Sequence, residues 1–125
     1  MTQDLPPVDD LTRRWWDATE QQRLLVQHCP QCDHYQHYPR AVCTACGSTD
    51  LEFLDAAGTG TVYSFTEVQR AVPPMTEAPY TVALVRLDEG PLLLTNIEGD
   101  TIACDGPVRV AWRPLADGRH LPVFR

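Results

Sequence analysis

The amino-acid sequence predicts a mainly β protein in two parts, and three observations lead to this fold class. Two C-x-x-C pairs stand close together in the first half of the chain, at Cys29–Cys32 and Cys43–Cys46. One short helical pattern precedes them. After Asp55, five runs rich in β-branched and aromatic residues follow one another without helical periodicity. We therefore expect an N-terminal helix and a small ribbon over residues 1–55, and a five-stranded barrel over residues 56–125.

The cysteine pairs predict a closed metal site. Each C-x-x-C turn places two thiolates on one metal ion, so that Cys29, Cys32, Cys43 and Cys46 complete a tetrahedron. We expect one zinc ion, although iron in a rubredoxin-like site uses the same ligands. Four thiolates leave no position open for water or substrate, so this metal should hold structure and do no chemistry. The alternatives are two disulfides or four free thiols.

Other candidate ligands and nucleophiles carry a weaker signal. His28, His34 and His37 lie near the cysteines in the sequence. Because four thiolates are already in register, we expect these histidines to be solvated or packing side chains. Cys104 stands alone, and no histidine beside it in the sequence can activate it. We expect it to be a buried, inert thiol.

The overall charge limits the classes of partner. The formal net charge is −7, with no lysine and ten arginines that are mostly scattered singly. Binding to nucleic acid phosphates needs a basic stripe, so a general nucleic-acid binder is disfavoured. The chain starts without the charged and apolar regions of an export signal, and it contains no run of about 20 apolar residues. Together with the paired thiolates, this predicts a cytoplasmic protein that does not cross a membrane.

The helix is expected over residues 11–20, with Asp9 or Asp10 as its cap. Trp15 and Trp16 are adjacent on it. Two neighbouring indoles cannot both bury against so short a helix alone. Either they pack on the ribbon, or at least one of them belongs to a partner interface, where tryptophan is favoured.

The strands of both parts can be placed from their composition. The ribbon strands are predicted at Leu24–His28, Tyr35–Tyr38 and Leu51–Leu54. The barrel strands are predicted at Thr61–Val68, Tyr80–Leu87, Leu92–Ile97, Val108–Trp112 and Leu121–Phe124. Five strands in this length suit a small Greek-key barrel of the OB type. Gly58 and Gly60 are expected to ease the bend at the start of the first barrel strand.

A long segment between the first two barrel strands is a candidate recognition loop. Residues 69–79 contain three prolines and exceed the usual length of a hairpin loop. Within this segment, Arg70 could meet a CoA phosphate or an acidic surface, and Met75 could pack against an apolar one. The alternative is an ordered surface loop without a binding role.

The order of these features resembles a known family. The tryptophan-bearing helix and cysteine ribbon are followed by Gly58–Thr66 (GTGTVYSFT), by Pro79–Gly90 (PYTVALVRLDEG) and by Leu121–Arg125 (LPVFR). Together they resemble the acyl-CoA-associated OB-fold proteins with an N-terminal rubredoxin-like zinc ribbon. The resemblance extends from about Trp15 to the last residue. The chain differs from the family at Asp33, where glycine is common, and at 104–107, which lacks a hydrophobic residue between its glycine and its proline.

The resemblance implies a non-catalytic accessory subunit. Such proteins accompany thiolase-fold enzymes, including thiolases and the related aldolases of lipid- and steroid-type acyl-CoA metabolism, stabilise them and help to bind or channel the CoA thioester. The chemistry would then lie on the partner, whose activity would need this chain. The candidate partner- or CoA-binding residues are Trp15, Trp16, Arg70 and Met75. The sequence itself contains no zinc-protease, nucleophile-elbow or P-loop motif, which agrees with this role.

Two alternative functions stay open at this point. In the first, the partner is a MaoC-type enoyl-CoA hydratase, which the sequence cannot separate from a thiolase-fold enzyme. In the second, the barrel binds single-stranded nucleic acid by stacking bases on aromatic side chains. Tyr63, Phe65 and Tyr80 could stack in this way, but the first two are as well explained as core residues. The acidic balance disfavours the second alternative.

Overall fold

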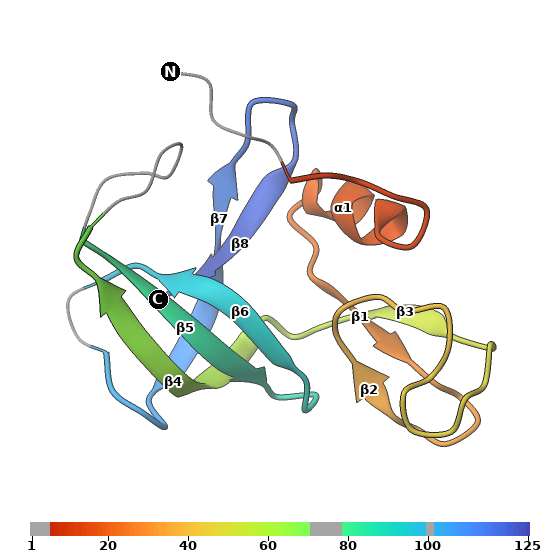
Figure 1. The fold of residues 1–125 in the computed structure, drawn as a ribbon. Helices are drawn as coiled ribbons and strands as arrows, with labels where there is room; N and C mark the ends of the chain where they lie inside the picture. The colour runs from red at the N-terminus through yellow and green to blue at the C-terminus, as the bar shows by residue number, and fades with distance from the viewer. Residues whose placement is uncertain (1–5, 71–78, 100–101) are drawn as a thin grey trace.

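The computed structural model describes residues 6–70, 79–99 and 102–125 and contains one helix, a three-stranded ribbon and a five-stranded barrel. Figure 1 shows helix α1 (Arg13–Thr19) above the ribbon, with the barrel beside them. The prediction of a mainly β chain with one helix, a ribbon and a five-stranded OB-type barrel is confirmed. Among the described residues, no helix is long and apolar enough to cross a membrane.

The ribbon is an antiparallel sheet in the order β2-β1-β3. Its strands are β1 (Leu25–His28), β2 (Tyr35–Gln36) and β3 (Glu52–Asp55). Strand β2 is shorter than predicted, and its two residues pair with the end of β1 just before the first cysteine. The central strand is the most buried of the three, because it has a neighbour on each side and also contacts the helix.

The barrel closes in the order β4-β5-β6-β8-β7, and β7 pairs back with β4. Its strands are β4 (Thr59–Val68), β5 (Tyr80–Leu87), β6 (Leu92–Ile97), β7 (Pro107–Pro114) and β8 (His120–Phe124). Numbered within the barrel, this order is 1-2-3-5-4, which is the Greek-key arrangement of an OB fold. Strands β6 and β8 run parallel and pair only at Ile97 and Phe124. Towards Leu121 the two strands therefore separate, and the barrel wall opens there.

The two glycines that open β4 allow close approach between strands. A Cβ at Gly60 would lie 2.3 Å from the carbonyl oxygen of Arg86, and a Cβ at Gly58 would lie 2.7 Å from a methyl group of Val110. Gly58 also has a positive φ of 83°, which favours glycine at the point where the chain turns into the barrel. The sequence analysis singled out Gly58 and Gly60 because of the bend at the start of this strand. The structure adds a second reason, since neither position has room for a Cβ atom.

The helix is shorter than predicted because a capped turn precedes it. Asp9 Oδ1 accepts a hydrogen bond of 2.9 Å from the backbone N–H of Thr12, and the backbone N–H of Asp9 donates to Thr12 Oγ1 at 3.1 Å. This is the reciprocal pattern of a capping box. Asp9 therefore caps the turn that precedes the helix, and the N-cap of the regular helix is Thr12. At the other end, Gln22 takes a positive φ of 56° and turns the chain into β1.

Helix α1 ties the ribbon to the barrel. Its buried face contributes to a core cluster that also includes Val26 of the ribbon and Phe124 of the barrel. Trp15 donates from Nε1 to the carbonyl oxygen of Leu25 at 2.9 Å. Trp16, the next residue, packs under the guanidinium of Arg119, 4.8 Å from the ring centroid. Consecutive helical side chains diverge by about 100°, so one indole faces the ribbon and the other faces the barrel.

Candidate functional site

The four ribbon cysteines converge on one point. Their sulfur atoms lie within 4.8 Å of one another, and all four cysteines are free of disulfides. Cys29 Sγ lies 3.7 Å from Cys46 Sγ, and Cys32 Sγ lies 3.6 Å from Cys43 Sγ. Zinc–sulfur bonds of 2.3 Å in a regular tetrahedron place the sulfurs about 3.8 Å apart. The geometry therefore fits one tetrahedral zinc ion, and it excludes the two-disulfide alternative for this structure.

The backbone of the second knuckle directs N–H groups at one of its sulfurs, that of Cys43. Burial raises the pKa of the Cys43 thiol, but the backbone N–H groups of Cys46 and Ala45 outweigh it and lower this pKa to about 6. The Ala45 N–H lies 3.4 Å from Cys43 Sγ. In the second knuckle Gly47 has a φ of 78° and donates its N–H to the carbonyl oxygen of Cys43. The four cysteines would hold zinc. The role of zinc at such a closed site is to stabilise the fold.

Asp33 fills the position where the resemblance leads us to expect glycine. Its φ is 64°, in the left-handed region that glycine adopts readily and aspartate tolerates. Its carboxylate lies 2.6 Å from His28 Nε2, and this contact raises the pKa of the His28 imidazole. The hydrogen bond anchors the turn between the first knuckle and β2. The substitution therefore keeps the shape of the turn.

The three histidines near the cysteines lie outside the four-sulfur cluster. His28 bonds to Asp33, and His34 Nε2 lies 3.1 Å from Thr44 Oγ1 on the exposed side of the ribbon. His37 packs on Trp15, with ring centroids 5.5 Å apart. The prediction that these residues are solvated or packing side chains is thus confirmed for the described part of the chain.

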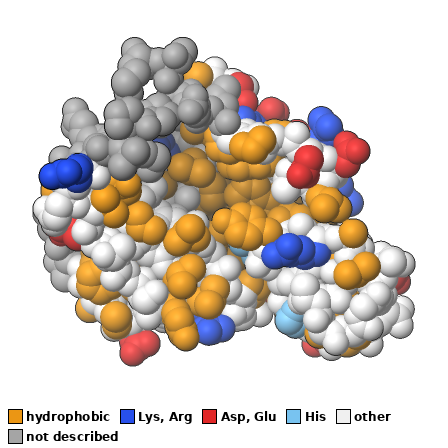
Figure 2. Space-filling model, viewed as in Figure 1, with side chains coloured by type: hydrophobic (Ala, Val, Ile, Leu, Met, Phe, Trp, Pro, Cys, Tyr) orange, Lys and Arg blue, Asp and Glu red, His pale blue; other side chains and the backbone are white. Residues whose placement is uncertain are grey.

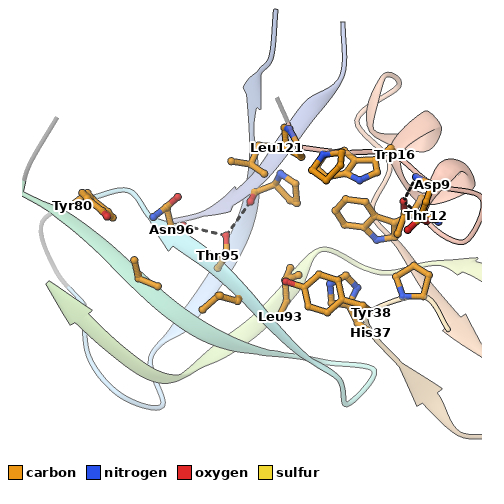
Figure 3. A pocket seen from close by; sticks show the side chains of 17 residues that line it. Asp9, Thr12, Trp16, His37, Tyr38, Tyr80, Leu93, Thr95, Asn96 and Leu121 are labelled. Atoms are coloured by element: carbon orange, nitrogen blue, oxygen red, sulfur yellow. Dashed lines mark hydrogen bonds between the residues drawn. The ribbon is translucent and has the colours of Figure 1, made fainter. Parts of the chain in front are cut away.

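A second site-like feature lies between the helix, the ribbon and the barrel. It is an apolar groove of about 540 Å³ that opens where β6 and β8 separate. Figure 2 shows hydrophobic side chains gathered in this hollow, and Figure 3 shows the 17 residues that line it. The lining residues are Pro6, Pro7, Asp9, Thr12, Trp15, Trp16, His37, Tyr38, Pro39, Tyr80, Val82, Leu93, Leu94, Thr95, Asn96, Leu121 and Pro122.

The two tryptophans line this groove on the side of the helix and are themselves packed within the chain. Trp15 is 6% exposed and Trp16 is 9% exposed. Of the two interpretations of this pair, packing describes the structure, because Trp15 packs on the ribbon and Trp16 on the barrel. The sequence could not indicate the second surface, since Arg119 is about a hundred residues away. That these indoles contribute to partner or ligand binding stays a prediction. They would do so as part of the lining of the groove.

His37 gives the groove an uncharged wall. Its Nε2 is buried and has no hydrogen-bond partner among the described residues. Burial lowers the pKa of the imidazole to about 4, so that the ring is neutral at neutral pH. Tyr38 lies beside it, 4.3 Å between ring centroids, and is 53% exposed at the rim. Sequence analysis placed His37 near the zinc ligands and missed its place in the groove.

The remaining predicted site residues lie elsewhere. Arg70 is exposed just beyond the end of β4, and Met75 lies outside the described residues. The prediction that Cys104 is buried is wrong. It is exposed because it stands in the turn before β7, where Asp105 has a φ of 64° and the backbone of Gly106 closes on Ala103.

The aromatic residues Tyr63 and Phe65 on β4 are exposed and do not belong to the core. Tyr63 is half exposed and lies under the guanidinium of Arg86, while Phe65 is 41% exposed. Alternation along β4 points Tyr63 outward next to the buried Val62, and a register shift between Val62 and Ser64 interrupts the pairing with β5 at this point. No basic groove surrounds these rings in the described part of the chain.

Fold and site together define the class of protein, a zinc ribbon joined to an OB-fold barrel. The family models that match are the rubredoxin-like zinc ribbon domain of ChsH2, over residues 16–52, and the C-terminal OB-fold domain of ChsH2, over residues 54–113. A solved structure described as "Ltp2-ChsH2(DUF35) aldolase" is 39% identical, covers 97% of this chain and 98% of its own, and superposes with a TM-score of 0.88. The chain belongs to this ChsH2-type DUF35 family.

Similar proteins are found in several organisms. A probable enoyl-CoA hydratase alpha subunit of Thermomonospora curvata is 42% identical over 96% of this chain, which spans only 39% of that longer protein. A DUF35 domain-containing scaffold protein of Pyrococcus furiosus is 34% identical over 86% of this chain and 81% of its own length. A benzoylsuccinyl-CoA thiolase subunit, BbsA, of Geobacter metallireducens is 29% identical over 77% of this chain and 66% of its own.

Proposed function

We propose that this chain is a non-catalytic accessory subunit of a thiolase-fold enzyme that acts on acyl-CoA thioesters. It would stabilise that enzyme and help to bind or channel the CoA thioester. The observation that carries the proposal is the full-length match to the ChsH2(DUF35) component named with an aldolase, at a TM-score of 0.88. The names of the Geobacter thiolase subunit and the Pyrococcus scaffold protein support the same role.

The chemistry of the described residues also supports a non-catalytic role. The metal ligands are four thiolates, which leave no position at zinc for water or substrate. Cys104 is exposed, but a nucleophile requires a base and an activating environment, and the described residues place no histidine against it in a hydrogen bond. The reaction therefore belongs to the partner, and this chain supplies stability and binding surface.

The groove and the nearby end of β4 are the surfaces that we assign to this role. Tyr80 lines the groove and pairs with Val68 at the end of β4, and Arg70 follows two residues later. We propose that Arg70 meets a CoA phosphate or an acidic partner surface, and that Met75 meets an apolar one. Trp15 and Trp16 would contribute through the lining of the groove.

The experiment is purification of the tagged chain from its source cells under gentle conditions, followed by mass spectrometry of what accompanies it. A stoichiometric thiolase-fold enzyme is the expected result. The partner should then lose stability or turnover when this chain is removed. A partner that is equally stable and active alone would refute the accessory role.

Two substitutions test the recognition segment. Arg70→Ala and Met75→Ala should weaken partner binding or acyl-CoA turnover of the complex, and Gln69→Ala is the neighbouring control. If both substitutions leave affinity and turnover unchanged, the segment has no role in recognition.

A MaoC-type hydratase is the second candidate partner, favoured by the name of the Thermomonospora relative. The same purification decides between the two, because it identifies the fold of the co-purifying enzyme. Co-purification of nucleic acid would instead support the single-strand alternative, against which the net charge of −7 argues. We place the protein in the cytoplasm, since four paired thiolates persist best in a reducing compartment.

A further inference from the structure

We propose that the groove between helix α1 and the barrel binds the uncharged, apolar acyl group of a thioester, and not its nucleotide end. This inference rests on the proposed function and names the part of the substrate that this chain recognises. The ligand would lie in the groove at the point where strands β6 and β8 separate.

Size and shape fit a small molecule. A volume of about 540 Å³ lies within the range of about 300–1,000 Å³ that is typical of ligand sites. Two packed indoles line the groove on the side of the helix, and Leu93 and Leu121 come from the separated barrel strands (Figure 3). Leu94, at the rim, is 55% exposed. A branched or ring-bearing acyl group could cover these side chains and remove apolar surface from water.

The charge of the lining selects against phosphate. Among the described residues that line the groove, Asp9 alone carries a formal charge, and it is negative. His37 is neutral at neutral pH, as its lowered pKa indicates. A phosphate placed here would find no cation and would lose its hydration, which is costly without an ion pair. The nucleotide end of CoA must therefore remain outside.

Two hydrogen-bonding side chains of the lining are already paired within the chain, which disfavours a peptide. A peptide in the groove would carry backbone N–H and C=O groups that need partners. The hydroxyl of Thr95 already donates to the carbonyl oxygen of Pro122 at 2.9 Å, and the amide of Asn96 donates to Thr81 at 3.1 Å. A hydrocarbon group needs no such partners. An acyl group is thus the occupant that this lining accommodates at least cost.

The test measures binding of acetyl-CoA, hexanoyl-CoA and decanoyl-CoA to the zinc-loaded full chain. Calorimetry gives the affinity, and tryptophan fluorescence of a Trp112→Phe background reports occupancy through the two groove indoles. The nucleotide is identical in all three probes. We expect Kd to fall by about fourfold for each added CH2 until the groove is filled. Affinity that does not depend on acyl length, or no binding of decanoyl-CoA, would overturn the inference.

A pair of matched variants locates the site. Leu94→Glu places a charge at the groove and should weaken decanoyl-CoA binding at least tenfold. Leu54→Glu adds the same charge at an exposed leucine of β3 outside the groove and should leave affinity unchanged. Equal effects of the two variants would mean that acyl-CoA binds somewhere else.

The outcome can be separated from that of the proposed function. If the chain co-purifies with its enzyme but shows no dependence on acyl length, the groove assignment fails and the accessory role stands. If binding depends on acyl length but no enzyme accompanies the chain, the accessory role fails and the groove assignment stands.

Discussion

His120 and Thr19 are joined by two hydrogen bonds although they lie 101 positions apart in the chain. His120 donates from Nδ1 to the carbonyl oxygen of Thr19 at 2.9 Å, and its backbone N–H donates to Thr19 Oγ1 at 3.2 Å. Thr19 is fully buried at the end of α1. The last barrel strand thereby bonds to the C-terminal end of the helix and holds the helix beside the groove.

His120→Ala should destabilise the protein by roughly 0.5–1.5 kcal/mol, because it removes one hydrogen bond to the carbonyl of Thr19, which keeps the backbone N–H of Gln22 as a second donor. The free energy of unfolding in urea measures this effect. His34→Ala is the control, since its imidazole bonds only to Thr44 on the exposed side of the ribbon. A loss of stability as small as that of the control would mean that the bond does not hold the helix.

Zinc removal should unfold the ribbon. Binding of a structural zinc ion by four thiolates contributes about 10–16 kcal/mol of apparent free energy, and in such small modules this is folding free energy. Cys32→Ser should therefore give insoluble protein or a lost N-terminal half, whereas Cys104→Ser should be tolerated. Zinc content and circular dichroism measure both. The reverse pattern would show that the essential cysteines have been misassigned.

Acid should weaken the fold through His37. Its pKa is about 4 in the folded protein and about 6.5 when exposed, so between these values the unfolded chain binds the extra proton. This contribution is fully present above pH 6.5 and is lost as the pH falls towards 4, by up to about 3 kcal/mol. Unfolding in urea at pH 7, 5.5 and 4.5 measures it. His37→Phe should lack this part of the pH dependence, while acid effects on the zinc thiolates are common to both proteins.

Gly60→Ala should be far more harmful than Gly118→Ala. The added methyl group at Gly60 would meet the carbonyl oxygen of Arg86 at 2.3 Å, and that oxygen belongs to the paired strand and cannot move aside. Overpacking of this kind costs about 1–3 kcal/mol or more. At Gly118, where φ is 92° and space is open, only backbone strain of about 1–2 kcal/mol is expected. Thermal unfolding compares the two, and similar losses would contradict the packing explanation.

Local patterns predicted most of the fold. The spacing of the cysteines predicted the metal centre, and runs of β-branched residues placed all five barrel strands to within a few residues. These signals are local because knuckles and strands are specified by neighbouring residues. The division of the chain between residues 55 and 56 stays a prediction.

Long-range relations could not be predicted. The indole of Trp16 is buried because Arg119 covers it, and nothing near Trp16 in the sequence indicates that contact. The burial of His37 and the groove beside it likewise depend on how the ribbon lies against the barrel. Cys104 was misplaced because a free cysteine without an activating histidine is usually buried, whereas the left-handed backbone of Asp105 makes a turn at the surface here.

The walls of the groove have a consequence for how such proteins can be recombined. Pro6 and His37 belong to one part of the chain, and Val82 and Pro122 belong to the other. Neither the ribbon nor the barrel encloses the hollow by itself. A chimera that exchanges the ribbon for that of a relative would keep its zinc and its barrel strands and still receive a differently shaped hollow. If the groove binds the acyl group as we propose, specificity is a property of the junction, and a useful change of specificity requires both modules to change together.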